Sequence, residues 1–174
     1  MRIEVILTEE IFRRFTVFDI MRRKKKWFPS AIFAAILGVS AAICFTMHHV
    51  QGAILLGSVL LAVGLGLPAV YFGTFFSSLK KEVVKHGLKR PQHVYTLELT
   101  PKAKGIAVSN EKEHAEFEWK KVHHVYRDLL ATYLFITPAR GFILPHTCVE
   151  EGDDALWELI EKKIPAERRT DIRK

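Results

Sequence analysis

Histidine and cysteine are the side chains of this sequence best suited to hold a metal ion or to act on a substrate. His48 and His49 are adjacent, as are His123 and His124, and neighbouring residues on a strand point to opposite faces. Neither pair has a cysteine or a carboxylate partner at ligand-like spacing. We therefore predict no metal site and no cofactor.

Nucleophilic catalysis needs a cysteine or serine with a base beside it and a third group that orients the base. Cys148 and His146 form the one local pair of this kind, but no glycine-rich loop accompanies them to hold an oxyanion. Cys44 and Cys148 make no C-x-x-C motif, and we expect both to serve as small apolar residues. The sequence predicts a protein that is not an enzyme.

A basic cluster at residues 22–26 lies directly before Trp27, Phe28 and an apolar run. Such clusters bind nucleic acid, address a chain to the nucleus, or hold a membrane helix in place. Residues 1–91 hold 13 Lys and Arg against 5 Asp and Glu, whereas residues 92–174 hold 13 against 14. The basic excess behind the net charge of +7 therefore lies beside the apolar segments, which argues against nucleic acid as a partner.

Two long apolar segments follow the cluster. Residues 27–47 and 53–76 contain no Asp, Glu, Lys, Arg or His, and each exceeds the ~20 residues that a helix needs to cross a bilayer. We predict two transmembrane helices, joined into a hairpin by the short loop at residues 48–52. A cleaved signal peptide is the competing interpretation of the first segment, but a secretory signal has a short leader and no second span directly after it.

The orientation of the hairpin follows from the charges on its flanks. The loop carries no formal charge, whereas residues 22–26 precede the hairpin and Lys80, Lys81, Lys85, Lys89 and Arg90 follow it. Because cytoplasmic flanks are enriched in Lys and Arg, we predict that both termini are cytoplasmic and that the protein is a multi-pass protein of the cytoplasmic membrane. The residues that we assign to membrane anchoring are Arg22, Arg23, Lys24, Lys25, Lys26, Trp27, Lys80 and Lys81.

Small residues recur at four-residue spacing in both apolar segments, and such residues let two membrane helices approach closely. We expect Gly38 and Gly57 to lie on the contact between the helices. The full set that we assign to helix packing is Ala34, Gly38, Ala42, Gly57 and Gly66.

The first residues of the chain alternate apolar and polar side chains, which predicts a strand at residues 2–7. Thr8 can cap a following helix, whose apolar side chains recur every three or four residues. The aromatic side chains of this helix lie in the inner headgroup layer, pack on the soluble domain, or do both. Because both chain ends are expected on one side of the membrane, the strand could add to an edge of the C-terminal sheet and cover it.

From residue 93 the apolar period changes to two, with strand-like runs at 93–100, 105–109, 115–119, 121–127, 130–137 and 141–145. Gly152 then begins an amphipathic helix, which Pro165 ends. We predict a small α+β domain in which an antiparallel sheet is closed by a C-terminal helix. Its expected core includes Trp119, Tyr133, Phe135 and Trp157.

The chain thus divides into four segments by its patterns. Residues 1–26 hold the N-terminal strand and amphipathic helix, and residues 27–76 the transmembrane hairpin. Residues 77–91 form a basic juxtamembrane helix, and residues 92–174 the soluble domain.

The layout and residues 117–145, FEWKKVHHVYRDLLATYLFITPARGFILP, resemble the YcxB-like proteins of bacteria. Trp119 opens a strand in this stretch, Tyr133 and Phe135 follow a turn, and an apolar strand ends at Pro145. The opening LTEEIF, residues 7–12, is also similar to the family's leader. The resemblance implies a bacterial membrane protein with a two-helix hairpin and a C-terminal pleckstrin-homology-like domain.

Two functions are consistent with these features. The first is a membrane-tethered module whose domain meets a protein partner or inner-leaflet lipid. The second is an accessory or structural subunit that docks into a larger membrane complex through its helices. Membrane lipids are partners in both, and self-association of the hairpin is compatible with either.

Overall fold

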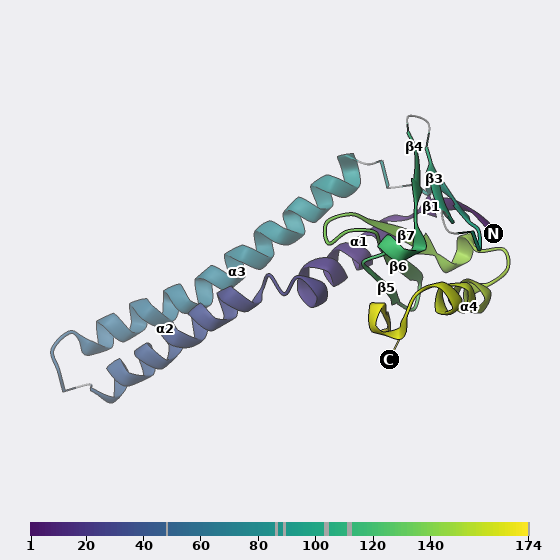
Figure 1. Cartoon of the computed structure of the whole chain (residues 1–174). Helices are drawn as coiled ribbons and strands as arrows, with labels where there is room; N and C mark the ends of the chain where they lie inside the picture. The colour runs from purple at the N-terminus through teal and green to yellow at the C-terminus, as the bar shows by residue number, and fades with distance from the viewer. Residues whose placement is uncertain (48, 86, 89, 103–104, 111–112, 174) are drawn as a thin grey trace. The chain divides into compact units, whose positions relative to one another are not determined.

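The computed structural model describes residues 1–47, 49–85, 87–88, 90–102, 105–110 and 113–173 (Figure 1). His48, considered above as a metal ligand, and Lys89, used above to orient the hairpin, lie outside the described residues. The chain forms two compact units. Unit 1 holds residues 1–15 and 87–174, and unit 2 holds residues 16–86.

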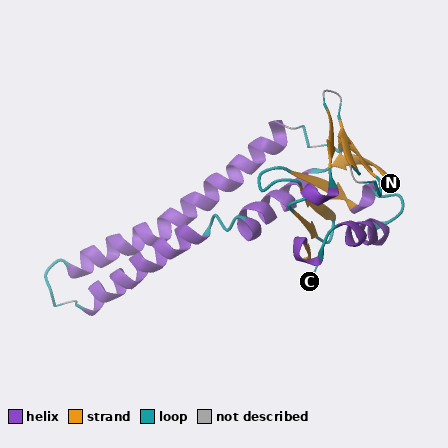
Figure 2. Ribbon diagram, viewed as in Figure 1, coloured by secondary structure: helices purple, strands orange, loops and turns teal. Residues whose placement is uncertain are grey.

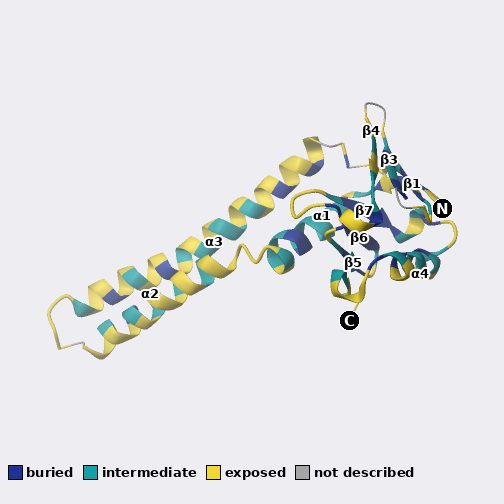
Figure 3. Ribbon diagram, in the orientation of Figure 1, coloured by how far each residue is buried: buried dark blue, intermediate teal, exposed yellow. Residues whose placement is uncertain are grey.

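Unit 2 contains two long helices that pack against each other, α2 (Phe28–Thr46) and α3 (Ala53–Lys85). They follow a six-residue π-helical turn, η1 (Phe18–Arg23). At 1.5 Å per residue α2 is about 28 Å long and α3 about 50 Å. Both helices are long and apolar enough to cross a membrane. Their apolar side chains are mostly exposed (Figure 3), whereas the long core helix of a soluble protein would be mostly buried.

Unit 1 contains two four-stranded sheets (Figure 2). The first has the order β1-β2-β3-β4, and all of its strand pairs are antiparallel. The second has the order β7-β6-β5-β8, in which β5 and β8 are parallel. The strands are β1 (Arg2–Leu7), β2 (Gln92–Leu99), β3 (Ile106–Ser109), β4 (His114–Phe117), β5 (His124–Arg127), β6 (Ala131–Phe135), β7 (Gly141–Pro145) and β8 (Arg169–Asp171).

Short helices complete unit 1. The N-terminal helix α1 (Glu9–Val17) begins at Thr8, whose hydroxyl accepts from the Ile11 N–H at 3.4 Å, as expected of a cap. The C-terminal helix α4 (Asp153–Lys163) has two carboxylates in its first turn and two lysines in its last, in the order that the helix dipole favours. Three single turns of 3-10 helix are η2 (Trp119–Lys121), η3 (His146–Cys148) and η4 (Ala166–Arg168).

The N-terminal strand joins the sheet of residues that follow the hairpin, an arrangement that the sequence left open. β1 pairs with β2 over Arg2↔Glu98 to Leu7↔Gln92, with one register shift between Val5 and Ile6. Its burial alternates strictly, with Ile3, Val5 and Leu7 buried and the residues between them exposed. One sheet is therefore built from residues on both sides of the apolar hairpin, and β1 covers the edge of β2.

A tyrosine links the two sheets. The Tyr95 hydroxyl on β2 donates to the carbonyl oxygen of Ile143 at 2.8 Å and accepts from its N–H at 2.7 Å. Both backbone groups belong to β7, an outer strand of the second sheet. Burial raises the pKa of Tyr95 well above its ordinary value, so the phenol stays protonated and can fill both roles.

The α+β class is confirmed, but three details of the predicted domain are wrong. The strands form two open sheets rather than one closed sheet, since β2, β3 and β4 belong to a sheet with β1, while β5, β6 and β7 belong to a second sheet with β8. Trp119 opens the turn η2 rather than a strand. The strand β8 was not predicted, because its three residues are polar and show no apolar alternation.

Candidate functional site

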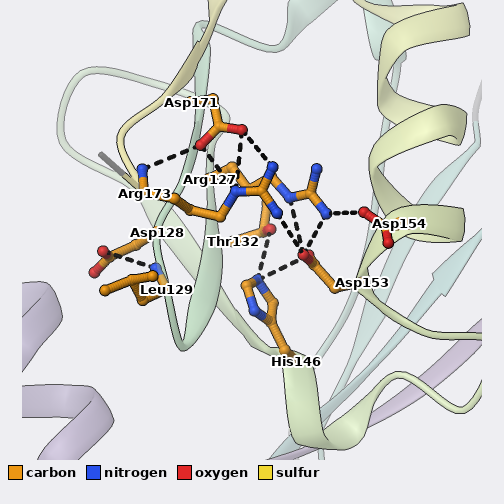
Figure 4. Close-up of polar contacts among 9 residues, drawn as sticks. All are labelled: Arg127, Asp128, Leu129, Thr132, His146, Asp153, Asp154, Asp171 and Arg173. Carbon is orange, nitrogen blue, oxygen red and sulfur yellow. Dashed lines mark hydrogen bonds and ion pairs between the residues drawn. The ribbon is translucent and has the colours of Figure 1, made fainter.

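The end of β5 carries two adjacent buried charges of opposite sign. Arg127 and Asp128 are 3% and 6% exposed, a degree of burial that charged side chains rarely show unless they are paired. The backbone N–H of Asp128 donates to the Ala131 carbonyl at 3.0 Å, which closes the turn from β5 to β6. We refer to these two residues and their polar partners as the Arg127–Asp128 cluster, whose part around Arg127 is drawn in Figure 4. The partners are Arg14, Leu129, Tyr133, Asp153 and Asp154.

Arg127 binds the first turn of α4. Its Nε donates to Asp153 Oδ2 at 2.9 Å, its second guanidinium nitrogen contacts the same oxygen, and that nitrogen also donates to Asp154 Oδ1 at 2.6 Å. The guanidinium carbon lies 5.3 Å from the centre of the Trp157 ring, a cation–π distance. One buried arginine thus fixes the beginning of α4 against the end of β5.

Asp128 binds α1 from the other side. Arg14 donates to it through Nε at 2.6 Å and through a second nitrogen at 3.1 Å, in a forked arrangement. The Tyr133 hydroxyl and the Leu129 N–H donate as well, at 2.9 and 2.8 Å. Burial alone would raise the pKa of Asp128, but these donors outweigh it and hold that pKa below its ordinary value.

Aromatic contacts support the same attachment of α1. The Phe15 ring lies 5.1 Å from the Tyr133 ring and 5.9 Å from the Phe135 ring. Of the two interpretations left open for the aromatic residues of this helix, the structure therefore supports packing on the domain at Phe15.

His146 lies beside Asp153 and Thr132 in the same cluster. Its Nε2 is 2.9 Å from Asp153 Oδ1 and 3.3 Å from the Thr132 hydroxyl. The Leu129 backbone is a further hydrogen-bond partner of His146, and Thr132 is fully buried, so His146 ties three parts of the domain together. Burial lowers the pKa of His146, although the charge of Asp153 opposes this.

The pair considered for nucleophilic chemistry is directed to different partners. Cys148 Sγ lies 3.4 Å from the backbone nitrogen of Ile6, while the ring of His146 faces Thr132 and Asp153. Within the described parts of the chain, no three His, Cys, Asp or Glu side chains are grouped to hold a metal ion. The Arg127–Asp128 cluster joins α1, α4 and the C-terminal residues to one strand, which is a positioning role.

Residues 102–162 match the YcxB-like protein family. The resemblance inferred from the sequence is thereby confirmed for this part of the chain. The stretch with the YcxB-like match carries Arg127, Asp128 and the first turn of α4, whereas Arg14 and the C-terminal strand β8 lie outside it. No curated protein and no solved structure matches the chain.

The residues assigned to membrane anchoring divide into two groups. Arg23 and Lys24 form ion pairs with the buried Asp19, on the π-helical turn. The Trp27 indole donates to the Met21 carbonyl at 3.0 Å, which closes the turn before α2. Lys24 and Trp27 are nonetheless exposed, as are the other members, Arg22, Lys25, Lys26, Lys80 and Lys81.

The glycines assigned to helix packing also differ among themselves. A Cβ added to Gly57 would lie 3.2 Å from the Ala41 carbonyl and 3.1 Å from Cys44 Cβ, so Gly57 faces α2. A Cβ on Gly38 or Gly66 would meet nothing within 4 Å. A side chain at either position would therefore extend into open space. The Gly38 backbone nitrogen nevertheless lies 3.9 Å from a Cβ placed on Gly64, so the backbone of Gly38 is close to α3. Ala34 is half-buried and Ala42 is exposed.

Gly64 is the packing residue that the sequence did not single out. A Cβ there would lie 3.2 Å from Leu37 Cβ and 3.5 Å from the Ala34 carbonyl. Gly57 and Gly64 are seven residues apart, which is two helical turns, and this spacing on one face could have revealed them.

The expected core residues of the domain are buried with one exception. Trp119, Tyr133 and Phe135 are buried, and the Trp119 indole donates to the Thr100 carbonyl at 2.9 Å. Trp157 is only half-buried, since its ring lies against the guanidinium of Arg127 at the beginning of α4.

Sequence reasoning missed Arg14, Arg127 and Asp128. The sequence YRD at residues 126–128 has the pattern of a strand that ends in a polar turn. One sequence signal could have indicated the site. Two adjacent carboxylates, Asp153 and Asp154, stand at the beginning of a predicted helix, where they could bind a cationic side chain from another element.

Proposed function

We propose that this chain is a membrane-tethered module without enzymatic activity. In this proposal unit 1 is a cytoplasmic, pleckstrin-homology-like domain that meets a protein partner or inner-leaflet lipid. The pairing of β1 with β2 carries the proposal, because residues before and after the apolar hairpin belong to one sheet. A hairpin that crosses the membrane twice returns its flanks to the same side, as that sheet requires.

The exposure of the hairpin supports the tether. Leu55 and Leu65 are 72% and 68% exposed, and a long apolar surface of this kind is unfavourable in water. Lipid would cover it. The exposed cations Arg22, Lys25 and Lys26 precede α2, and Lys80 and Lys81 follow the apolar part of α3. The excess of positive charge on these flanks favours a cytoplasmic orientation.

The organisation of unit 1 supports an interaction domain. Two four-stranded sheets and the C-terminal helix α4 fit the pleckstrin-homology-like layout. Within the Arg127–Asp128 cluster, Arg127 is paired with the carboxylates of α4 and Asp128 is paired with Arg14. Paired charges of this kind are expected of a cluster that stabilises the fold. Leu129, in the turn beside Asp128, is 56% exposed, and an exposed apolar side chain at a loop tip is available for contact with a partner.

The second candidate function is that of an accessory subunit, and the outward glycines favour it. Gly38, Gly66 and Gly73 have open space where a side chain would extend. Small residues on an outer face allow a further membrane helix to approach closely. In that function the hairpin docks to a complex.

Site-specific photo-crosslinking in native membranes separates the two functions. A photoreactive residue replaces Leu129 in one variant and Gly66 in another, and the adducts are identified by mass spectrometry. An interaction module gives a defined protein or lipid adduct from position 129. An accessory subunit gives a protein adduct from position 66 and none from 129. Recovery of the uncrosslinked chain from both variants contradicts both functions.

A further inference from the structure

The last strand of unit 1 occupies the outer edge of the second sheet. β8 follows α4 and η4 and pairs in parallel with β5, in the register Val125↔Arg169 to Arg127↔Asp171. Just after β8, the Ile172 N–H donates to the Arg127 carbonyl at 2.8 Å. Without β8, the N–H and C=O groups on this edge of β5 would be open to another strand.

β8 itself contributes no buried apolar side chain, although Ile172 directly after it is half-buried. Arg169 is half-buried, Thr170 and Asp171 are exposed, and Ile164 is the last buried apolar residue of the described chain. Parallel pairs are slightly less stable per residue than antiparallel pairs. Its attachment therefore depends chiefly on backbone hydrogen bonds and polar side-chain contacts, and water can replace both kinds of contact.

The side-chain contacts of this segment place its arginines opposite carboxylates of α4. Arg169 lies 3.5 Å from Glu161, and Arg173 lies 3.5 Å from Asp153, as Figure 4 shows for the second pair. Arg173 also binds Asp171 of its own segment, at 2.7 Å, and Asp153 is bound by Arg127 as well. Arg168 donates to two backbone carbonyls, those of Lys120 and Val122. His124 and Thr170 are in contact through Nε2 and the hydroxyl at 2.9 Å.

We propose that the β5 edge is a strand-acceptance site for an extended, arginine-bearing segment of a partner protein, and that residues 165–173 occupy it in the partner's absence. Removal of this segment would leave the β5 edge without a paired strand. Glu161 and Asp153 would each lose one arginine partner. A segment with two arginines four positions apart restores both ion pairs while its backbone adds to the sheet. The proposal rests on the interaction role proposed above and names the surface that serves it.

Amide hydrogen exchange on the intact chain in detergent tests whether the segment detaches. The Ile172 amide is compared with the His123 amide, which donates to the Phe135 carbonyl on the other side of the same sheet at 2.8 Å. Local detachment predicts exchange at Ile172 at least about 100-fold faster than at His123. Equal protection of the two amides means that β8 opens only with the whole sheet, and this result overturns the proposal.

A chain that ends at Ile164 tests acceptance of a strand in trans. A fluorescent peptide of residues 165–173 is titrated onto the truncated and the full-length chains in the same detergent. The truncated chain should bind it at least about tenfold more tightly, because in the full-length chain the tethered segment competes at high effective concentration. A truncated chain that is folded, by its circular dichroism, and binds no peptide contradicts the proposal.

Substitutions on α4 test the chemistry of the partner. E161Q in the truncated chain should weaken peptide binding about two- to fivefold, the range for an exposed ion pair. E158Q is the matched control, since Glu158 faces Lys162 on the same helix and should change nothing. If the peptide carries R169Q, the ion pair with Glu161 is already absent. E161Q in the chain should then weaken binding of that peptide no further. Equal effects of E161Q and E158Q overturn the preference for an arginine-bearing segment.

None of these three experiments depends on the membrane or on the native partner. Failure of strand acceptance therefore leaves the crosslinking result at Leu129 free to support or contradict the proposed function by itself.

Discussion

At the residue scale, the domain depends on two adjacent charges that face opposite ways. Arg127 neutralises the first turn of α4, and Asp128 receives Arg14 from α1. Because each charge is buried, loss of its partners leaves a desolvated charge, which is far more costly than the pair is favourable. Substitutions here should therefore act on the attachment of helices to the sheet.

Asp128→Asn should lower the free energy of unfolding of the domain by about 1–3 kcal/mol, because Arg14 and Tyr133 lose a charged acceptor of unchanged size. Asp154→Asn makes the same chemical change where the side chain is 94% exposed, and its effect should be clearly smaller. Urea unfolding followed through tryptophan fluorescence measures both. An equal decrease in the free energy of unfolding for both variants would show that the buried position of Asp128 gives its contacts no extra weight.

His146 should make the domain less stable in mild acid. Burial lowers its pKa from the ordinary value of 6.5, so the unfolded chain binds a proton more readily than the folded domain does. The free energy of unfolding therefore falls as pH drops below about 6.5 and levels off below the folded-state pKa. His146→Gln should flatten this fall, whereas His114→Gln, at an exposed position on β4, should leave it unchanged.

At the element scale, the chain's first strand completes a sheet formed by residues that follow the hairpin. β1 contributes three buried apolar side chains, more than β8 at the other end of the chain. This difference explains why we treat β1 as part of the framework and β8 as an exchangeable strand.

Ile3→Ala should cost about 2–5 kcal/mol of domain stability, the range for truncation of a buried isoleucine. Ile6→Ala is the matched control on the same strand, since Ile6 is 44% exposed and should change stability little. The same urea unfolding measures both variants. Similar costs would mean that β1 does not bury its alternate residues against the domain.

In the hairpin, Gly57→Leu and Gly66→Leu separate the inner from the outer face of α3. A side chain at Gly57 meets Ala41 and Cys44 at contact distance, so leucine there should cost about 1–3 kcal/mol through overpacking. At Gly66 the space is open, and leucine should be tolerated. The melting temperatures of the two variants are measured in detergent from the thermal loss of the helical circular dichroism signal. A lower melting temperature for Gly66→Leu than for Gly57→Leu would contradict the observed helix contact.

The sequence predicted elements better than their pairing. Apolar periodicity located both long helices and the strands from β1 to β7, because those signals are local. The division into two sheets depends on which strands meet, and the link through Tyr95 and Ile143 joins residues 48 positions apart. β8 has no apolar period to detect, and the bond from Arg14 to Asp128 spans 114 positions, so neither could be derived from the sequence.

At the scale of the whole molecule, one folded unit is interrupted in sequence by an apolar hairpin. Residues 1–15 and 87–174 form that unit, and residues 16–86 form the other. In the proposed orientation, the basic excess on the flanks of the hairpin lies on the cytoplasmic side. This connectivity makes the topology of the hairpin the central claim of the account.

Cysteine accessibility in intact cells tests this claim most directly. In a variant with Cys44 and Cys148 replaced by alanine, a single cysteine is placed at Gln51, between the helices, or at the exposed Glu150 of unit 1. A membrane-impermeant maleimide should label Q51C in intact cells and E150C only after the membrane is permeabilised. Labelling of E150C in intact cells, or protection of Q51C until permeabilisation, would contradict a hairpin with both flanks in the cytoplasm.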